Sequence, residues 1–436
     1  MRLVDYICKA YPPLSNLRGK LLHLRSFVRM QILAFRTRRR YGKILARIHA
    51  YPVDRKIRVL FLLNESSKWK CQSLYEALSW HGGFEPMVVA VRADADWKMS
   101  AEEFASKYAR LKDFCRSRQL RCVDGYSLAD DKPIGLDALR PDVVFYSNPW
   151  KVAECQQPQN IASFALTCYI PYYVVCYDAP EMDSQQDFHR LLWRYILPNE
   201  FWATYFRKEL GRKKIAGSMV GLGHPMLDVF STAKNDFKKE DYVIYAPHWS
   251  IPGTGCEDYS TFLETGEFIL EYAMSHKELK WCFKPHPTLR IALRDNANWP
   301  KERIDAYYSA WGKAGIACYD GNYPELFMKS RALITDCSSF LMEYSSTNRP
   351  LIHLVSSRCR FPPAPPSRNL FESFYVARDK GELVAVLRQV LEENKDPKKD
   401  KRESAIRDLN IWHVNSADVI VGYISKSLRI KIDIAD

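Results

Sequence analysis

The sequence predicts an α/β protein in which two Rossmann-like, doubly wound domains face a central cleft, preceded by a basic amphipathic helical arm. The chain has 436 residues, more than one hydrophobic core usually holds, so two domains are expected. From residue 51 onward, short apolar segments alternate with segments of helical length. Apolar strands separated by helices are typical of parallel sheets covered on both faces.

The arm comprises residues 1–50 and holds most of the excess positive charge. It carries twelve Lys or Arg and one acidic residue, a net charge of +11, whereas the rest of the chain has about +2. On a helix, one face is apolar and consists of Leu21, Leu24, Val28, Ile32 and Phe35. The neighbouring face is basic and consists of Arg25, Arg29, Arg36, Arg40, Lys43 and Arg47. We expect this helix to bind an anionic membrane surface, with packing against the body as the alternative, and we expect no nucleic-acid partner.

Two series of strands are expected in the body. The first consists of Ile57–Leu63, Met87–Val91, Asp142–Tyr146, Thr167–Ile170 and Tyr173–Cys176. The second consists of Tyr242–Tyr245, Lys280–Phe283, Ala332–Ile334 and Leu351–Leu354. Helices are expected at Ala101–Ser117, Phe188–Tyr195, Tyr259–Ser275, Lys301–Ala314, Glu382–Glu392 and around Ser404–Ser427. A polar stretch near Asp228–Lys239 separates the two series, which predicts domains at residues 51–230 and 231–436.

Cysteine usage and hydropathy predict a cytoplasmic protein that is peripheral on the inner face of the cell membrane. The twelve cysteines form no C-x-x-C pair, so neither structural zinc nor a disulfide framework is expected. The Asp94-Ala95-Asp96 pattern can hold a divalent cation, but we interpret it as a solvated loop and predict no metal site. No apolar stretch is suited to cross a membrane, and the N-terminus does not resemble a cleaved signal peptide.

Three segments that follow strands of the second series contain the candidate site residues. In open α/β sheets, ligands bind outside the carboxyl ends of the strands. Ser338 and Ser339 follow Asp336 and open a helix, whose free N–H groups suit a phosphate, with a simple helix cap as the alternative. Glu343 lies one turn further and is placed to accept hydrogen bonds from ribose hydroxyls, with a solvated helix face as the alternative.

Two histidines follow the other strands of this series. His286 lies between Pro285 and Pro287, which fix the backbone on both sides. A histidine there suits proton transfer from a hydroxyl or, when charged, contact with a phosphate oxygen, and a structural role is the alternative. Lys284 adds a cation, and His248 is expected to face the same cleft.

In this order and spacing, the three segments resemble the CDP-glycerol glycerophosphotransferase family, the teichoic-acid and capsule polyol-phosphate transferases. The similarity covers about residues 215–390. Its motifs are Tyr245-Ala246-Pro247, His286-Pro287, Thr335-Asp336-x-Ser338-Ser339 and Arg349-Pro350.

The resemblance implies a GT-B-type fold, with an acceptor domain at residues 51–230 and a CDP-donor domain, including the last helix, at 231–436. It implies transfer of glycerol phosphate or ribitol phosphate from a CDP-linked donor to a hydroxyl of a lipid-linked or saccharide acceptor. CMP is released, without metal or other cofactor, in teichoic-acid, capsule or O-antigen synthesis. His286 is then catalytic, and Lys284, Thr335, Asp336, Ser338, Ser339 and Glu343 bind the donor.

One family motif, His-Gly-Thr-Pro in the first domain, is absent from this chain, and the segment containing Tyr177-Asp178 is expected in its place. The catalytic base is therefore open between His286, His248 and Asp178. Two other functions also remain open. One is a GT-B glycosyltransferase that uses a CMP- or UDP-sugar in capsule or lipopolysaccharide synthesis, and the other is a non-catalytic membrane-peripheral assembly protein.

Overall fold

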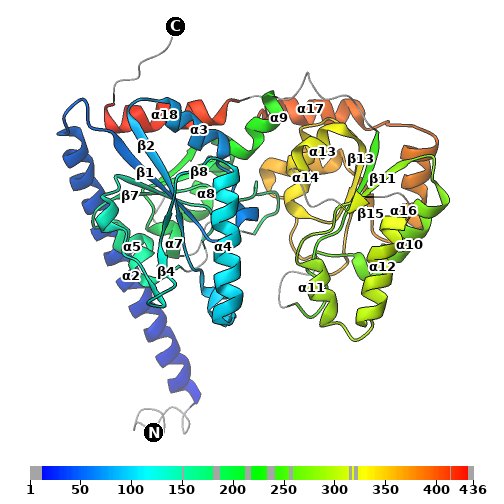
Figure 1. Ribbon diagram of the computed structural model, residues 1–436, viewed down its shortest axis with the longest axis horizontal. Coiled ribbons are helices and arrows are strands. Elements are labelled where there is room, and N and C mark those ends of the chain that lie inside the picture. Colours follow the sequence, from blue (N-terminus) through cyan, green and yellow to red (C-terminus); the bar gives the residue numbers. More distant parts are fainter. Residues whose placement is uncertain are drawn as a thin grey trace.

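The computed structural model describes residues 12–149, 152–179, 187–211, 218–232, 241–254, 259–313, 317–318, 323–412 and 414–430. Two α/β halves lie side by side, the N-terminal half blue to green and the C-terminal half yellow to orange (Figure 1). Each half is built around a parallel sheet with helices packed against it. This architecture confirms the predicted fold class.

The N-terminal sheet has seven strands. They are β1 (Ile57–Leu63), β2 (Phe84–Ala90), β3 (Cys122–Asp124), β6 (Val143–Tyr146), β7 (Leu166–Tyr169), β8 (Arg194–Leu197) and β9 (Met219–Gly221). Their order is β3-β2-β1-β6-β7-β8-β9, and every pair is parallel. β6 and β7 are buried at every position, as expected of apolar strands covered on both faces.

The C-terminal sheet has six strands. They are β10 (Tyr242–Ala246), β11 (Lys280–Phe283), β12 (Ala317–Cys318), β13 (Ser330–Thr335), β14 (Leu351–Leu354) and β15 (Tyr375–Ala377). Their order is β12-β11-β10-β13-β14-β15, again all parallel. Helices in this half include α10 (Phe262–Ser275), α12 (Lys301–Lys313), α13 (Tyr323–Lys329), α14 (Ser338–Ser345) and α16 (Lys380–Leu387).

The strand order reverses at one point in each sheet, between β1 and β6 and between β10 and β13. Side chains or loops that follow these strands meet there. In the N-terminal sheet, Asn148 Nδ2 donates to Asn64 Oδ1 at 3.0 Å. In the C-terminal sheet, the backbone N–H of His248 donates to Asp336 Oδ1 at 2.5 Å. Ligands of doubly wound sheets bind at such switch points, so these residues mark the place to look for a site.

Three predicted elements differ from the structure. Tyr173–Cys176 forms no strand, and the sheet is instead extended by β8, in a region where a helix was expected at Phe188–Tyr195. Only Asp187–Arg190 is helical there, as α7. The last helix is two helices, α17 (Lys399–Leu409) and α18 (Ser416–Leu428).

α18 packs on the N-terminal half, although the sequence grouped it with the C-terminal domain (Figure 1). Its apolar residues share a hydrophobic cluster with Leu74 and Leu78 of α3 (Gln72–Trp80). Asp228 anchors its first turn, because its carboxylate accepts the N–H groups of Ser416 at 2.8 Å and Ala417 at 3.0 Å. The chain therefore returns to the first sheet after completing the second.

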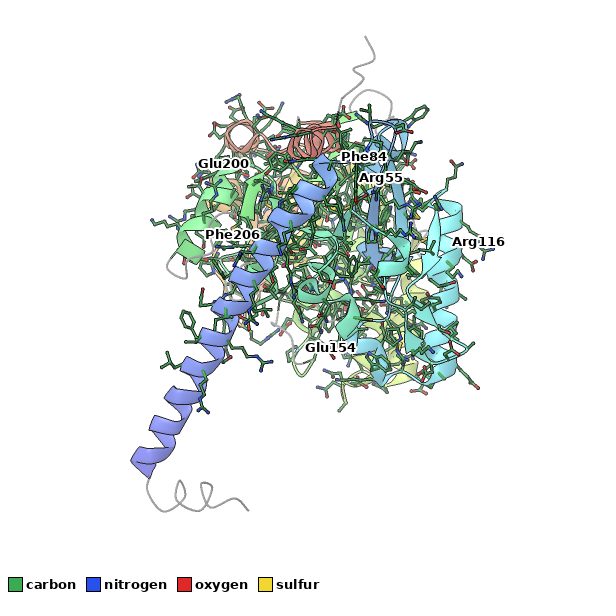
Figure 2. The ribbon with its side chains drawn as sticks, turned by 90° about the vertical axis from the view of Figure 1, so that its left-hand side faces the viewer. Arg55, Phe84, Arg116, Glu154, Glu200 and Phe206 are labelled. Atoms are coloured by element: carbon green, nitrogen blue, oxygen red, sulfur yellow. The ribbon has the colours of Figure 1, made fainter. Side chains whose placement is uncertain are left out.

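The arm is one uninterrupted helix, α2 (Pro12–His49), which projects beyond the body (Figure 2). Its inner part is core, because Ala34, Tyr41, Ile44 and Ile48 are each 4% exposed. Tyr41 Oη also bonds with Thr167 and with a main-chain carbonyl. The outer part exposes large apolar side chains, namely Leu24, Phe27, Val28, Ile32 and Phe35. The helix α2 thus has an inner, buried part and an outer, exposed part, and the side chain of Leu21 lies outside those described.

Candidate functional site

Asp336 holds together two loops of the C-terminal half. One oxygen of its carboxylate accepts the backbone N–H of His248, and the other accepts the backbone N–H of Thr261 at 2.6 Å. Burial raises the pKa of this carboxyl to about 6, against the opposing effect of these hydrogen bonds. The adjacent Thr335 is also fully buried, and its hydroxyl donates to the carbonyl of Ala246 at 2.6 Å. Both predicted donor-binding residues are therefore engaged within the protein and position the loops around them.

His248 and His286 lie next to each other at the ends of β10 and β11, with ring centroids 5.3 Å apart. The N–H of Thr288 donates to Nδ1 of His286 at 3.2 Å, and the N–H of Ser250 donates to Nδ1 of His248 at 3.2 Å. A backbone N–H can only donate, and the Ser250 hydroxyl, 2.7 Å from Nδ1 of His248, accepts the N–H of Tyr259 and has its own proton to donate, so we assign Nδ1 as the acceptor and Nε2 as the protonated nitrogen of both rings. Within the described residues, neither Nε2 has a hydrogen-bond partner.

Both imidazoles are neutral at ordinary pH. Burial, and then the neighbouring His286, lower the pKa of His248 to about 3. Burial and the nearby Lys284 lower the pKa of His286 to about 4, while Glu65 opposes this shift. Each ring therefore offers an Nε2–H hydrogen-bond donor that remains uncharged above about pH 5.

The helix α14 begins beside these histidines, as the sequence predicts. Cys337 is its N-cap, and no side chain caps its first turn. Ser338 therefore does not cap the helix with its side chain, and that alternative is wrong. Ser338 and Ser339 are both half-buried, and Ser339 Oγ lies 3.4 Å from the Cys337 thiol. The first backbone N–H groups of a helix have no intrahelical acceptor, so this end can receive an anion.

A buried cluster of charged groups lies behind the start of α14. Lys70, which follows β1, donates from Nζ to the Tyr323 hydroxyl at 2.6 Å. The Nζ of Lys284 lies 5.3 Å from the Tyr323 ring and 5.4 Å from the Phe340 ring. Burial raises the pKa of Glu343, and Lys70 is the strongest of the groups that oppose the rise. Glu343 is 1% exposed and its Oε2 has no hydrogen-bond partner, so it is not a solvated helix face.

The N-terminal half contributes a carboxylate near His286. Glu65 follows β1 directly and forms an ion pair with Lys68 at 3.3 Å. Burial opposes its ionisation, but Lys68 and Ser67 outweigh burial and lower the pKa of Glu65. Its charge in turn opposes the lowering of the pKa of His286, as the smallest of the effects on that imidazole. We call His248, Lys284, His286, Ser338 and Glu343, together with Glu65 and Lys70, the junction site.

Asp178 lies on a strap that joins the halves. Cys176 and Asp178 bond with the loop at residues 362–367 of the other half, and Tyr177 stacks on Tyr259 with centroids 5.4 Å apart. The ring centroid of Tyr259 in turn lies 5.8 Å from that of His248. Asp178 itself accepts a hydrogen bond from the Tyr205 hydroxyl. No contact joins Asp178 to either histidine among the described residues.

Glu65, Lys70 and Tyr323 were not singled out by the sequence interpretation. Glu65 and Lys70 follow β1, so the rule applied to the second sheet identifies them when it is applied to the first. Tyr323 follows no long strand, and its sequence gives no such signal. Asp96 also differs from expectation, since it is buried and its carboxylate accepts from Lys107 at 2.6 Å rather than lying in a solvated loop.

The described residues offer neither a metal-binding cluster nor a membrane-spanning helix. No group of three or more His, Cys, Asp or Glu side chains among them is arranged to hold a metal ion. None of the described helices combines the length and the apolar character that crossing a bilayer requires. The nine cysteines whose side chains are described form no disulfide.

Two parallel doubly wound sheets, with candidate ligand groups at the switch point of the second, define a GT-B-like protein. The sequence profile of the CDP-glycerol:poly(glycerophosphate) glycerophosphotransferase family matches residues 189–413. This is more than half of the chain, and the chain belongs to that family, which confirms the resemblance. A search of curated proteins found no matching sequence.

Solved structures share the fold at low identity. A putative UDP-N-acetylglucosamine 2-epimerase from Listeria monocytogenes has a TM-score of 0.54 and 14% identity, over 87% of this chain and 100% of that one. The UDP-GlcNAc 2-epimerase of Neisseria meningitidis has a TM-score of 0.53 and 13% identity, over 85% of this chain and 100% of that one. The wall teichoic acid polymerase TagF has a TM-score of 0.48 and 12% identity, over 95% of this chain and 98% of that one. The two epimerases show the same two-sheet fold.

Proposed function

We propose that the protein transfers glycerol phosphate or ribitol phosphate from a CDP-linked donor to a hydroxyl of a lipid-linked or saccharide acceptor, in teichoic-acid, capsule or O-antigen synthesis. Family membership supports the donor class. The observation that carries the proposal is the pair of neutral imidazoles, each with a free Nε2–H, beside the start of α14. Donors aimed at phosphoryl oxygens stabilise charge that develops during phosphoryl transfer.

In the proposed step, the acceptor oxygen bonds to the distal phosphorus of the donor, and the bond from that phosphorus to CMP breaks. His248 and His286 donate from Nε2 to oxygens of the transferred phosphoryl group. Lys284 and the N-terminus of α14 stabilise the charge on the departing CMP. We assign this charge compensation to protein groups, without a metal ion. Glu343 bonds with the Tyr323 hydroxyl but keeps Oε2 without a partner among the described residues, and we assign this oxygen to the ribose hydroxyls.

The acceptor proton goes to a carboxylate, because both imidazoles already hold their proton on the accessible nitrogen. Glu65 is ionised and acts on His286, so we assign it this role. Asp178 is less suited, because one of its oxygens accepts from Tyr205. A weak base is sufficient when the transition state is loose.

The donor is tested by incubating the full chain with CDP-glycerol, CDP-ribitol, CMP-sugars and UDP-sugars, with and without candidate acceptors. The expected result is acceptor-dependent CMP release from a CDP-polyol, lost in His286→Ala. Release only from a sugar nucleotide would replace the proposal with a glycosyltransferase. Turnover of no donor, together with a His286→Ala variant that supports normal polymer synthesis, would favour the assembly protein.

We also propose that the outer part of α2 binds the anionic inner face of the cell membrane. Phe35 is 62% and Leu24 is 57% exposed, with Arg25 and Arg29 exposed beside them. Each basic residue near such a surface contributes about 1 kcal/mol. Arg40 and Arg47 instead donate to carbonyls of the body, at 3.2 Å and 2.7 Å. They hold the helix in place, whereas Lys43 and Arg36 are exposed.

A chain that begins at residue 34 and carries Phe35→Gln tests this proposal, because it keeps the buried part of α2 and removes the exposed large apolar side chains. We expect it to remain folded and to stop sedimenting with vesicles that contain phosphatidylglycerol. Beginning at residue 51 removes core residues and is not a clean test. Unchanged vesicle binding by the shorter chain would contradict the proposal.

A further inference from the structure

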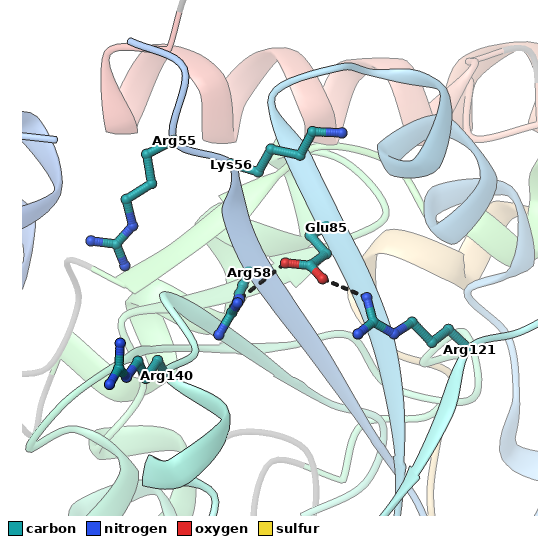
Figure 3. Close-up of a pocket in the computed structure, with 6 residues that line it drawn as sticks. All are labelled: Arg55, Lys56, Arg58, Glu85, Arg121 and Arg140. Atoms are coloured by element: carbon teal, nitrogen blue, oxygen red, sulfur yellow. Dashed lines mark hydrogen bonds and ion pairs between the residues drawn. The ribbon is translucent and has the colours of Figure 1, made fainter. Parts of the chain in front are cut away.

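A second charged cavity lies where strands of the N-terminal sheet begin, whereas the junction site lies where strands end. Figure 3 shows the residues that line this cavity. It has a volume of about 740 Å³ and is lined by Arg55, Lys56, Arg58, Glu85, Arg121 and Arg140. We call it the basic groove. Its residues lie at or just before the starts of β1, β2, β3 and β6, whereas the junction site follows the carboxyl ends of strands. The basic groove is therefore separate from the proposed catalytic residues.

The basic groove is strongly positive although the body is nearly neutral. Five of its six lining side chains are cationic. Two carboxylates offset part of this charge. Glu85 in the lining lies 3.0 Å from Arg58 Nε and also pairs with Arg121 (Figure 3), and the buried Asp142 lies 3.7 Å from Arg55. The side chains of Lys56 and Arg140 are exposed and have neither an ion pair nor a hydrogen bond among the described residues. Like charges this close repel one another, and a concave surface of one sign concentrates counter-ions.

Arg140 occupies a backbone position that favours glycine. It closes a short 3₁₀ turn at Asp137–Leu139 with φ 48° and ψ 52°, in the left-handed region. Its side chain has no partner within the described residues that could explain an arginine there. An arginine side chain is thus present at a backbone position where glycine, which has no side chain, is the favoured residue.

The lining also indicates the chemistry of the ligand. The residues that line it are all charged, with no aromatic or aliphatic residue among them, so it favours an anionic ligand over an acyl chain. Guanidinium groups bind phosphate oxygens through paired N–H donors, and four of them surround this groove. Because they come from separate segments around an open cavity, they suit several phosphates spaced along a chain.

We propose that the basic groove binds a chain of phosphodiesters, such as a polyol-phosphate acceptor that extends away from the junction site. This assignment rests on the proposed function, because that function supplies a ligand of this class. Holding the chain at a second point keeps the acceptor on the protein when its end leaves the junction site.

Binding of a fluorescent oligo(glycerol phosphate) to the full chain, measured by anisotropy without donor, tests the proposal. The double variant Arg121→Gln, Arg140→Gly removes two cations, and glycine relieves the left-handed position. We expect binding at least tenfold weaker at 0.1 M salt and a slope of log K against log salt that is reduced by about 1.5. The melting temperature should not fall. Arg388→Gln, a variant of an exposed arginine in the other half, is the matched control.

Equal binding by the double variant and the wild type would overturn the proposal. The same measurement with pyrophosphate, and with phosphatidylglycerol vesicles, separates other sources of phosphate. If the double variant no longer binds pyrophosphate or the vesicles but still binds the oligomer, the assignment of a phosphodiester chain as the ligand is wrong. If no CDP-polyol serves as donor but the double variant still loses oligomer binding, the proposed function fails and the basic groove stands.

Discussion

The two halves of the molecule bring different kinds of side chain to the junction site. The C-terminal half supplies partly or fully buried groups whose positions are fixed by backbone hydrogen bonds, such as the two histidines and Asp336. The N-terminal half supplies charged side chains held by other side chains, such as Glu65 with Lys68 and Lys70 with Tyr323. This contrast suggests a rigid surface for the donor and more adjustable charges opposite it.

Substitution of His286 has the largest expected effect. His286→Ala should lower kcat/KM by on the order of 10²-fold or more, because a donor to the phosphoryl group is lost. His286→Gln should retain more activity than His286→Asn, since the glutamine amide reaches the position of Nε2 and the asparagine amide that of Nδ1. The pH–rate profile of the wild type should show no loss near pH 6.5, because the pKa of His286 is lowered to about 4.

His276→Gln, on the surface of the same half, is the control for this series. If His286→Asn is instead the better replacement, Nδ1 is the functional nitrogen, and if activity falls with a pKa near 6.5, His286 acts as a base. The C-terminal half would then supply the proton acceptor as well as the donor surface.

Asp336→Asn should lower both stability and kcat. Each carboxylate oxygen accepts a backbone N–H, from His248 and from Thr261, and an asparagine can accept only one of them. One buried N–H then loses its partner, at a cost of about 2 kcal/mol in the free energy of unfolding. Denaturant titration and steady-state kinetics measure the two effects, with the exposed Asp408→Asn as control. A variant with wild-type stability would show that this half is not held as rigidly as the hydrogen bonds indicate.

Lys70→Met should have the smallest effect of the three and should act on binding. Lys70 reaches Tyr323 and opposes the rise in the pKa of Glu343, so its loss favours the protonated form of Glu343. We expect the KM for the donor to rise about tenfold, with a smaller change in kcat and little change in stability. The exposed Lys98→Met is the matched control. A fall in kcat with an unchanged KM would remove the contrast between the two halves.

Elements defined by local periodicity and capping were predicted well from the sequence. The helix Ala101–Ser117 is observed with the predicted ends, since Ser100 and Glu103 form a capping box at its start. The strands Ile57–Leu63, Lys280–Phe283 and Leu351–Leu354 also have their predicted ends. Each is a short apolar run bounded by polar residues, so the residues next to it in sequence determine it.

Other assignments depended on partners that are distant in sequence. Tyr173–Cys176 is as apolar as a strand, but it leads into the strap between the halves, and β8 extends the sheet instead. α18 is amphipathic in any context, and only contact with α3 and Asp228 places it on the first sheet. Local sequence specifies a buried face, whereas the surface that covers the face is selected by packing of the whole chain.

The sequence by itself determined the fold class, the family and the strand ends that carry His248, His286 and Ser338. Those features follow from periodicity and from short motifs. Only the tertiary structure decided which nitrogen of each histidine holds the proton, because that depends on the direction of a backbone N–H. It likewise brought Lys70 close to Glu343, since electrostatic interaction depends on separation in space and burial, neither of which sequence distance records.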